Sequence, residues 1–239
     1  MIELLELTKS YNRGEIRAVD DLSLTVERGE IYGFLGPNGA GKTTTIKLMV
    51  GILAPDSGQV ILDGVNLAED PLAAKLKLGY VPDNPDLYPR VTGLEYLRFL
   101  GDVYQVPHKE RTERTEKLGE AFSLIQNLGD PIGSFSHGMR QKLAIMGAML
   151  AAPPILILDE PLVGLDPKSS HLLKEILREH ASLGNIVFFS THILEVAERF
   201  CHRLGIINHG QLIASGTLEE LKKGEQGTLE EIFLEVTEK

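Results

Sequence analysis

The stretch "GPNGAGKTTT", residues 36–45, constrains the fold of this chain more than any other. Two glycines five residues apart, followed by a lysine and a threonine, satisfy the pattern of a phosphate-binding loop, which needs a strand before it and a helix after it. Residues 30–35 are apolar enough for a buried strand, and residues 42–50 contain no Pro or Gly and precede Gly51. The alternative is a glycine-rich turn before an ordinary helix. Because both flanks agree with the loop, we expect a strand, loop and helix in an α/β fold.

The residue types of this loop predict a polyphosphate site. Glycines let the backbone curl so that successive N–H groups point at an anion, and the helix N-terminus adds partial positive charge. Lys42 is predicted to reach the β- and γ-phosphates of a nucleotide, and the Thr43 hydroxyl to help hold Mg²⁺. The predicted nucleotide-binding residues of the loop are Gly36, Pro37, Asn38, Gly39, Ala40, Gly41, Lys42, Thr43 and Thr44.

Length and charge limit the remaining possibilities. A chain of 239 residues with a mass of 26.3 kDa can form one large α/β domain or two small ones. No apolar run approaches the roughly 18 residues that span a bilayer, the N-terminus lacks a signal-type segment, and Cys201 is the one cysteine. These features favour the cytoplasm. The net charge of −10 argues against broad nucleic-acid binding, so no nucleic-acid partner is expected.

Hydrophobic patterns indicate a single domain with a helical insertion. A helix is expected from Thr92 to about Tyr104, and a charged helical segment near 109–127 follows it. Strand patterns occupy residues 2–7, 22–26, 59–64, 155–160, 185–192, 203–208 and 211–216. Capping-box spacing marks helix starts at Thr92 with Glu95, Thr217 with Glu220, and Thr228 with Glu231.

Two acids follow a strongly apolar strand, in "ILILDEP" at residues 155–161. Four consecutive aliphatic residues suit a strand buried on both faces, and open α/β sheets bind ligands at the carboxyl ends of such strands. Asp159 is therefore predicted to orient Mg²⁺ or its water, and Glu160 to polarise a water aimed at the γ-phosphate. The alternative is a helix-capping acid beside a surface acid.

The stretch "FSHGMRQ", residues 135–141, predicts a second anion site. Ser136 is a good N-cap residue, Gly138 allows close backbone approach, and residues 139–150 have the pattern of a helix with an apolar face. The alternative is a capped helix that binds no ligand.

Taken together, these motifs resemble the ATP-binding subunits of ABC transporters, over nearly the whole chain. The family's signature is Leu-Ser-Gly-Gly-Gln; Ser136 and Gly138 match it, whereas Phe135, His137 and Met139 depart from it. The downstream "LVGLDP" resembles the family's D-loop, with Asp166, and "STH" supplies the switch histidine, His192. Motif order and approximate spacing agree with the family.

The resemblance implies a P-loop NTPase (RecA-like) α/β core with an N-terminal antiparallel β subdomain and an inserted α-helical subdomain. In this chain the core and β subdomain are expected at about 1–83 and 151–216, the helical subdomain at about 84–150, and a short helical tail at about 217–239.

The resemblance also implies site roles. ATP and Mg²⁺ are the expected cofactors, with Glu160 and His192 catalytic. Tyr11 is expected to stack on the adenine, and the alternative is an exposed loop tyrosine. Ser136, Gly138 and Asp166 are expected to complete the nucleotide site of a second ATP-binding subunit, which is either a second copy of this chain or a paralogue.

One position departs from the family in a way that concerns the metal. The family has a glutamine where "LGYVPDNPDLYP" places Asp83. Asp is shorter than Gln, cannot donate a hydrogen bond when ionised, and adds negative charge near phosphates. Asp83 is expected either to approach Mg²⁺ through a water or only to shape the loop. The expected metal-site residues are thus Thr43, Asp159 and Asp83.

The function implied is ATP hydrolysis that powers a separate integral membrane permease, with the chain peripheral on the inner face of the cell membrane. Leu87, Tyr88 and Leu94 are the expected dock, although such a cluster also suits local core. The compact length, the signature form and the closing "LEEIFLEVT" look most like the ATPases of bacterial type-2 exporters. Alternatives are an importer ATPase, a soluble ABC protein of translation or DNA repair, and a P-loop small-molecule kinase.

Overall fold

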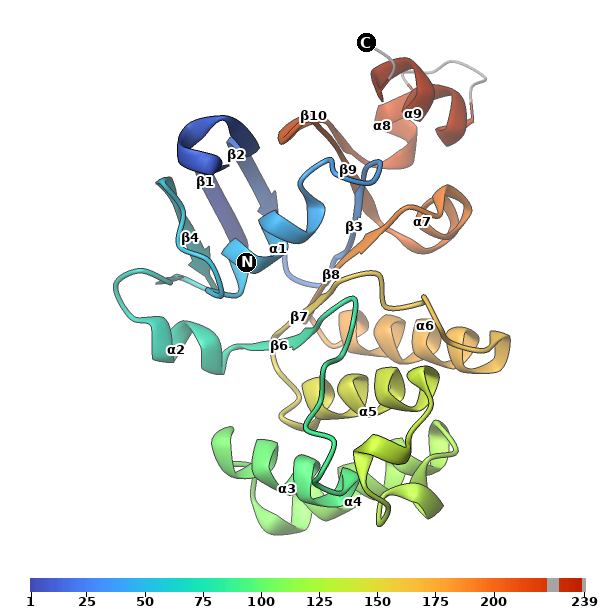
Figure 1. The fold of residues 1–239 in the computed structure, drawn as a ribbon. Helices are drawn as coiled ribbons and strands as arrows, with labels where there is room; N and C mark the ends of the chain where they lie inside the picture. Colours follow the sequence, from blue (N-terminus) through green and yellow to red (C-terminus); the bar gives the residue numbers. More distant parts are fainter. Residues whose placement is uncertain (223–227, 238–239) are drawn as a thin grey trace.

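The computed structural model describes residues 1–222 and 228–237, in which strands and helices alternate around two sheets (Figure 1). The strands are β1 (Ile2–Tyr11), β2 (Ile16–Val26), β3 (Ile31–Leu35), β4 (Ser57–Leu62), β5 (Val65–Asn66), β6 (Leu78–Val81), β7 (Ile155–Leu158), β8 (Ile186–Thr191), β9 (Arg203–Asn208) and β10 (Gln211–Gly216). The α-helices are α1 (Lys42–Met49), α2 (Pro71–Leu76), α3 (Gly93–Val103), α4 (His108–Ala121), α5 (His137–Leu150), α6 (Pro167–Ser182), α7 (Leu194–Phe200), α8 (Leu218–Lys222) and α9 (Leu229–Thr237).

The larger sheet carries the functional edge. Its described strands run in the order β10-β9-β3-β8-β7-β6, all parallel except β10, which pairs antiparallel with β9. Strand β7 shows why the sequence is continuously apolar here: Ile155 and Ile157 face one core cluster, whereas Leu156 and Leu158 face another. Because side chains alternate between the faces, a strand covered on both sides needs apolar residues at every position.

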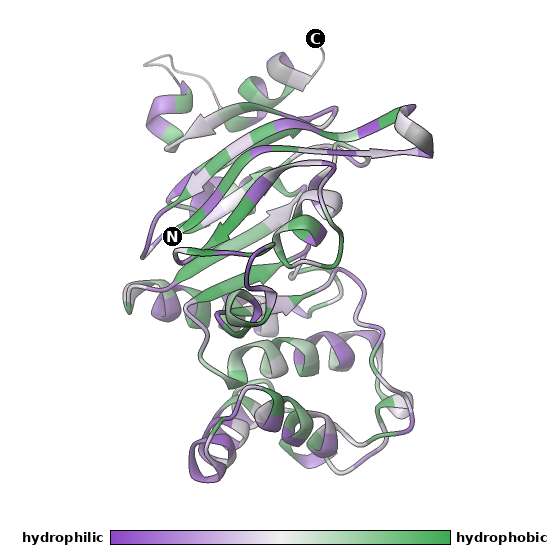
Figure 2. Cartoon of the chain, turned by 90° about the vertical axis from the view of Figure 1, so that its left-hand side faces the viewer, coloured by the Kyte–Doolittle hydropathy of each residue, from purple (hydrophilic) through white to green (hydrophobic). Residues whose placement is uncertain are grey.

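The smaller sheet is antiparallel and has the order β2-β1-β4-β5 among the described strands. Its inner face, helix α1 and one face of the larger sheet share a single hydrophobic cluster. Figure 2 shows green, hydrophobic stretches in the strands of this layered region, with white and purple segments between them. The N-terminal strands therefore hold α1, and with it the phosphate-binding loop, against the larger sheet.

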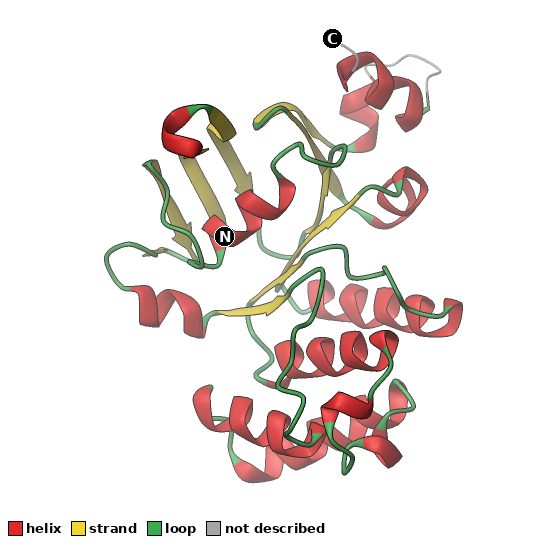
Figure 3. Cartoon of the chain, viewed as in Figure 1, coloured by secondary structure: helices red, strands yellow, loops and turns green. Residues whose placement is uncertain are grey.

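Helices cover the opposite face. Helices α5 and α6 pack against the larger sheet, and α3 and α4 extend this helical region away from the sheets (Figure 3). The capping-box predictions are confirmed, because each Thr hydroxyl accepts from the Glu N–H and each Glu carboxylate accepts from the Thr N–H. The pairs are Thr92 with Glu95, Thr217 with Glu220, and Thr228 with Glu231.

The charged helix ends earlier than the sequence indicates. Helix α4 stops at Ala121, and a short 3-10 turn (Ile125–Asn127) follows it. Ser123 has a backbone φ of 56°, in the left-handed region that terminates helices, and Leu124 donates its N–H back to the Gly119 carbonyl. The expected continuation of the helix to residue 127 is wrong for this reason.

The predicted fold class is confirmed, with an antiparallel β subdomain beside a RecA-like sheet and a helical insertion between β6 and β7. The predicted tail at 217–239 contains α8 and α9, and its residues 223–227 and 238–239 lie outside the described part of the chain. Within the described residues, no helix combines the length and the apolar character needed to cross a membrane.

Candidate nucleotide-binding site

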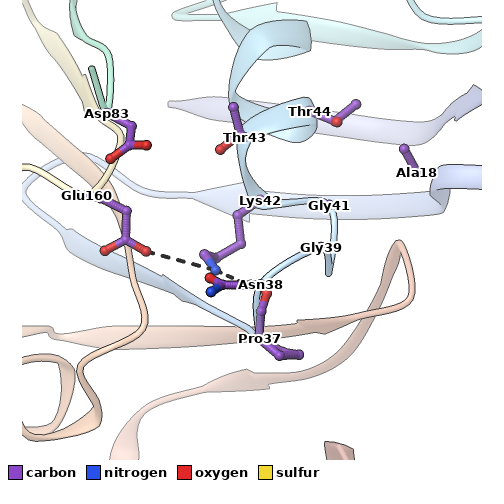
Figure 4. A pocket seen from close by; sticks show the side chains of 10 residues that line it. All are labelled: Ala18, Pro37, Asn38, Gly39, Gly41, Lys42, Thr43, Thr44, Asp83 and Glu160. Carbon is purple, nitrogen blue, oxygen red and sulfur yellow. Dashed lines mark hydrogen bonds and ion pairs between the residues drawn. The ribbon is translucent and has the colours of Figure 1, made fainter. Parts of the chain in front are cut away.

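A cleft of about 220 Å³ opens where β3 ends and α1 begins, at the carboxyl edge of the larger sheet (Figure 4). Figure 4 shows Asp83 and Glu160 on the side of the cleft next to Thr43 and Lys42. The cleft is lined by Ala18, Pro37, Asn38, Gly39, Gly41, Lys42, Thr43, Thr44, Asp83 and Glu160. Two further loop residues, Gly36 and Ala40, are buried and are not part of this lining.

The path of the loop depends on glycine. Gly41 is the N-cap of α1 with a φ of 110°, and a Cβ there would lie 2.2 Å from the Ala18 carbonyl oxygen. A Cβ on Gly36 would lie 2.5 Å from the Ile207 carbonyl oxygen. No side chain among the described residues caps α1, so its first N–H groups remain available to an anion. A polyphosphate cradle needs these features, and the contacts of the loop with phosphate stay a prediction.

Lys42 is held at the cleft by local contacts. Its ammonium donates to the Gly36 carbonyl at 2.6 Å and lies 3.9 Å from a Glu160 carboxylate oxygen. Burial lowers the pKa of Lys42, and the carboxylates of Glu160, Asp159 and Asp83 oppose that shift. The Lys42 ammonium is thus a buried positive charge close to several carboxylates.

The ends of β7 and β8 are joined by a short hydrogen-bond network. The buried Ser190 hydroxyl donates to Asp159 Oδ1 at 2.5 Å, and it accepts the Glu160 N–H at 3.0 Å. Asp159 is only 1% exposed, and its Oδ2 atom has no hydrogen-bond partner among the described residues. A buried carboxylate oxygen without a donor is costly, and a cation or its water would satisfy it.

Glu160 is oriented by an unusual backbone. Its φ of 47° is in the left-handed region, which non-glycine residues rarely adopt and which is found at functional sites. One carboxylate oxygen faces Lys42, and the other lies 3.0 Å from His192 Nδ1. The structure therefore brings the two predicted catalytic residues, Glu160 and His192, into contact.

Asp83 reaches the same edge through strand pairing. Strands β6 and β7 are parallel, and Asp159 donates its N–H to the Val81 carbonyl at 2.8 Å. Asp83 follows two residues after Val81 and lines the cleft. Burial, followed by Asp159 and Asp83, raises the pKa of Tyr80 to about 12, so both carboxylates act on one phenol. Asp83 thus lines the cleft, and its approach to Mg²⁺ stays a prediction.

The remaining predicted nucleotide contacts lie away from the cleft lining. Ser136 caps α5 by accepting the Met139 N–H at 3.2 Å. A Cβ on Gly138 would lie 2.8 Å from the Gly164 carbonyl oxygen, so the signature packs tightly against the D-loop. Tyr11 is 38% exposed at the end of β1 and does not line the cleft.

Asp166 also lies outside the cleft lining, where it caps α6. Its carboxylate accepts from the Ser169 N–H and hydroxyl, at 2.9 and 2.6 Å, and pairs with Lys142 at 3.0 Å. These bonds from Ser169, with Lys142, hold the pKa of Asp166 well below its ordinary value. Lys142 thereby ties the signature helix α5 to the D-loop at the start of α6.

Two residues of the site escape sequence inspection. Ser190 joins Asp159 to Glu160, and Ala18 forms the cleft wall from β2, which is distant in sequence. A signal for Ser190 exists, because it directly precedes Thr191 and His192 at the end of a strand expected to lie beside the acidic one. Nothing in the local sequence marks Ala18.

Comparison with known proteins places these features in one family. The family profile described as "ABC transporter" matches residues 19–163. The chain is similar to the ATP-binding protein EcsA of Bacillus subtilis (36% identity over 99% of this chain and 96% of that protein). It is also similar to the linearmycin resistance ATP-binding protein LnrL of Bacillus subtilis (37%; 92% and 70%) and to Nod factor export ATP-binding protein I of Ralstonia nicotianae (38%; 92% and 68%).

Comparison with solved structures leads to the same family. One described as the ATP binding subunit of an ABC transporter has a TM-score of 0.94 and 35% identity, and covers 99% of each chain. The dimeric ATP-binding cassette MJ0796, bound to ADP and Pi, has a TM-score of 0.83 and 27% identity, and covers 91% of this chain and 99% of that one. The profile match over more than half of the chain, with relatives of over 30% identity along nearly all of it, shows that this chain belongs to the ABC transporter family, as an ATP-binding subunit that hydrolyses ATP to drive transport.

Proposed function

We propose that this chain works as one of two ATP-binding subunits on a separate integral membrane permease, at the cytoplasmic face, and that its ATP hydrolysis drives export. The resistance and export roles in the names of LnrL and the Nod factor protein support the direction. The dimeric cassette of similar fold supports a pair of subunits. The absence of a membrane-crossing helix among the described residues agrees with a separate permease.

Hydrolysis is assigned to the acids at the end of β7. Glu160 accepts a proton from the water that attacks the γ-phosphate, while Lys42 stabilises the phosphate charge. His192 orients Glu160 and contacts the γ-phosphate. Thr43, Asp159 and Asp83 are the residues that would hold Mg²⁺, which would offset the negative charge of the phosphates. The unpartnered Asp159 Oδ2 supports this assignment.

The observation that carries the proposal is the position of Glu160. One of its oxygens lies 3.9 Å from Lys42 Nζ and the other 3.0 Å from His192 Nδ1, on a left-handed backbone at the rim of the phosphate cleft. An acid that served only to cap a helix would not need a phosphate-facing lysine and a histidine on its two oxygens. This geometry favours water activation.

The second half of the site is assigned to the partner subunit. Ser136, Gly138 and Asp166 lie outside the cleft of their own chain, so we assign them to the nucleotide bound by the facing subunit. The exposed ring of Tyr11 is assigned to stacking on the adenine.

The permease contact is assigned to the helical insertion. Tyr88 and Phe99 are 69% and 58% exposed, and with Val91, Glu95 and Tyr96 they line a hollow of about 470 Å³. Leu87 and Leu94, which the sequence places in the same dock, pack instead against the core cluster of the insertion. Tyr88 is thus the residue of the predicted dock that remains open to a partner.

The test is affinity purification of the tagged full chain from detergent-solubilised cells. Recovery of a polytopic membrane protein at one copy per ATPase is expected. Tyr88→Ala with Phe99→Ala should reduce that recovery at least about fivefold, whereas Leu183→Ala, which removes a 73% exposed side chain at the end of α6, should not. Recovery of ribosomal or DNA-repair proteins with no membrane protein would overturn the transport role and leave the ATPase chemistry intact.

A further inference from the structure

The nucleotide cleft is rich in acid for a site that takes a polyanion. Among the described residues that line it, Lys42 is the one cation, whereas Asp83 and Glu160 are carboxylates (Figure 4). Asp159 directly precedes Glu160 and also acts on Lys42. A nucleotide that arrives without a metal ion therefore meets several negative charges for each positive one.

The segments that carry Asp83 and Asp159 lie side by side because strands β6 and β7 are hydrogen-bonded neighbours. The Asp159 N–H bonds to the Val81 carbonyl at 2.8 Å, and Asp83 follows two residues after Val81. Both carboxylates act on the phenol of Tyr80 and on the ammonium of Lys42. Asp83 thus lines the cleft, and Asp159 is buried directly before Glu160, which also lines it.

Both carboxylates have free oxygen atoms. Within the described ranges 1–222 and 228–237, the buried Asp159 Oδ2 has no hydrogen-bond partner, and the Asp83 side chain accepts no hydrogen bond. Magnesium in nucleotide sites is held by one or two carboxylates together with substrate phosphates, not by a full protein cage. This matches the finding that no cluster of three or more His, Cys, Asp or Glu residues suited to a metal occurs among the described residues.

We propose that Asp83 is a specificity-determining residue that, together with Asp159, admits nucleotide as its magnesium complex and excludes the metal-free form. With Mg²⁺ between the acids and the phosphates, the charge of Asp83 attracts the complex. Without Mg²⁺, the same charge repels the phosphates. The inference rests on the proposed position of the phosphates beside Lys42.

The test measures ADP binding to the full chain by calorimetry, with Mg²⁺ and then with EDTA; ADP is used because it is not hydrolysed. The wild-type chain is expected to bind metal-free ADP at least about 100-fold more weakly than Mg-ADP. Asp83→Asn keeps the size of the side chain and removes its charge. It should reduce the ratio of the two dissociation constants, metal-free ADP over Mg-ADP, about tenfold, chiefly because metal-free ADP binds more tightly. Asp83→Glu should keep most of the ratio.

Asp86→Asn is the matched control, because it makes the same change three residues away, on an exposed side chain outside the cleft lining. Its binding ratio should equal that of the wild type. An unchanged ratio in Asp83→Asn would overturn the inference, and Asp83→Ser supplies a second neutral variant should the first fail to fold. If the wild-type chain binds neither form of ADP, the proposed phosphate site itself fails, which distinguishes the two claims.

Discussion

At the scale of single residues, the proposed hydrolysis depends on the Glu160 carboxylate, which lies between Lys42 and His192. Glu160→Gln should lower the rate of ATP hydrolysis by about 10²- to 10⁴-fold, because an amide cannot take a proton from water. Affinity for Mg-ADP should stay within a few fold, since the Lys42 ammonium and the loop are unchanged. Steady-state phosphate release and calorimetry measure these two quantities. Glu195→Gln, which makes the same change at an exposed position on α7, is the control. A Glu160→Gln rate close to that of the wild type would remove Glu160 from the mechanism.

Ser190 is a second residue whose contribution to the site a single substitution can test. Its hydroxyl fixes both Asp159 and the Glu160 backbone, so Ser190→Ala should leave Asp159 short of its donor. The concentration of Mg²⁺ that gives half the maximal ATPase rate should rise, and the free energy of unfolding should fall by about 1–3 kcal/mol. Ser134→Ala, which removes a hydroxyl bonded to the Pro131 carbonyl in the insertion, serves for comparison. Identical Mg²⁺ curves for the wild type and Ser190→Ala would contradict a positioning role.

At the scale of elements, the loop before α1 depends on close backbone approach as well as on glycine flexibility. Gly41 and Gly39 both have positive φ, of 110° and 81°. A Cβ on Gly41 would meet the Ala18 carbonyl at 2.2 Å, whereas a Cβ on Gly39 would meet nothing within 4 Å. Gly39→Ala should thus cost only about 1–2 kcal/mol of backbone strain, and Gly41→Ala at least about 2 kcal/mol more. Urea unfolding measures both values. Equal losses of unfolding free energy in the two variants would mean that the β2 backbone at Ala18 moves to make room for the added Cβ.

The same elements mark what the sequence can and cannot predict. Strands such as β7 were predictable because burial on both faces demands an unbroken apolar run, and capping pairs such as Thr92 with Glu95 are local. The early end of α4 was not predictable, because it depends on Ser123 taking a left-handed backbone that most residues avoid. The contribution of Ala18 to the cleft was not predictable either, since it depends on the packing of β2 against α1.

At the scale of the whole molecule, the separation of the two predicted anion sites has a consequence for how the chain would assemble. The cleft at Lys42 and the α5 N-terminus at Ser136 do not line one pocket within the described chain. If each nucleotide needs both, two subunits must face each other, and ATP joins them. The chain carrying Glu160→Gln should thus become a dimer with Mg-ATP, because the nucleotide persists, and should stay a monomer with EDTA. Light scattering after size-exclusion chromatography measures the mass.

A second substitution separates assembly from nucleotide binding. Adding Ser136→Arg to the Glu160→Gln chain should abolish the Mg-ATP dimer, because the arginine fills the space above the α5 N-terminus that the facing nucleotide would occupy. Binding of Mg-ATP to the monomer should persist, since Ser136 lies outside the cleft of its own chain. Adding Ser182→Arg instead, at the C-terminal end of α6, should leave the dimer intact. A dimer that tolerates Ser136→Arg would show that α5 does not face the nucleotide of the partner, and the two anion sites would then act separately.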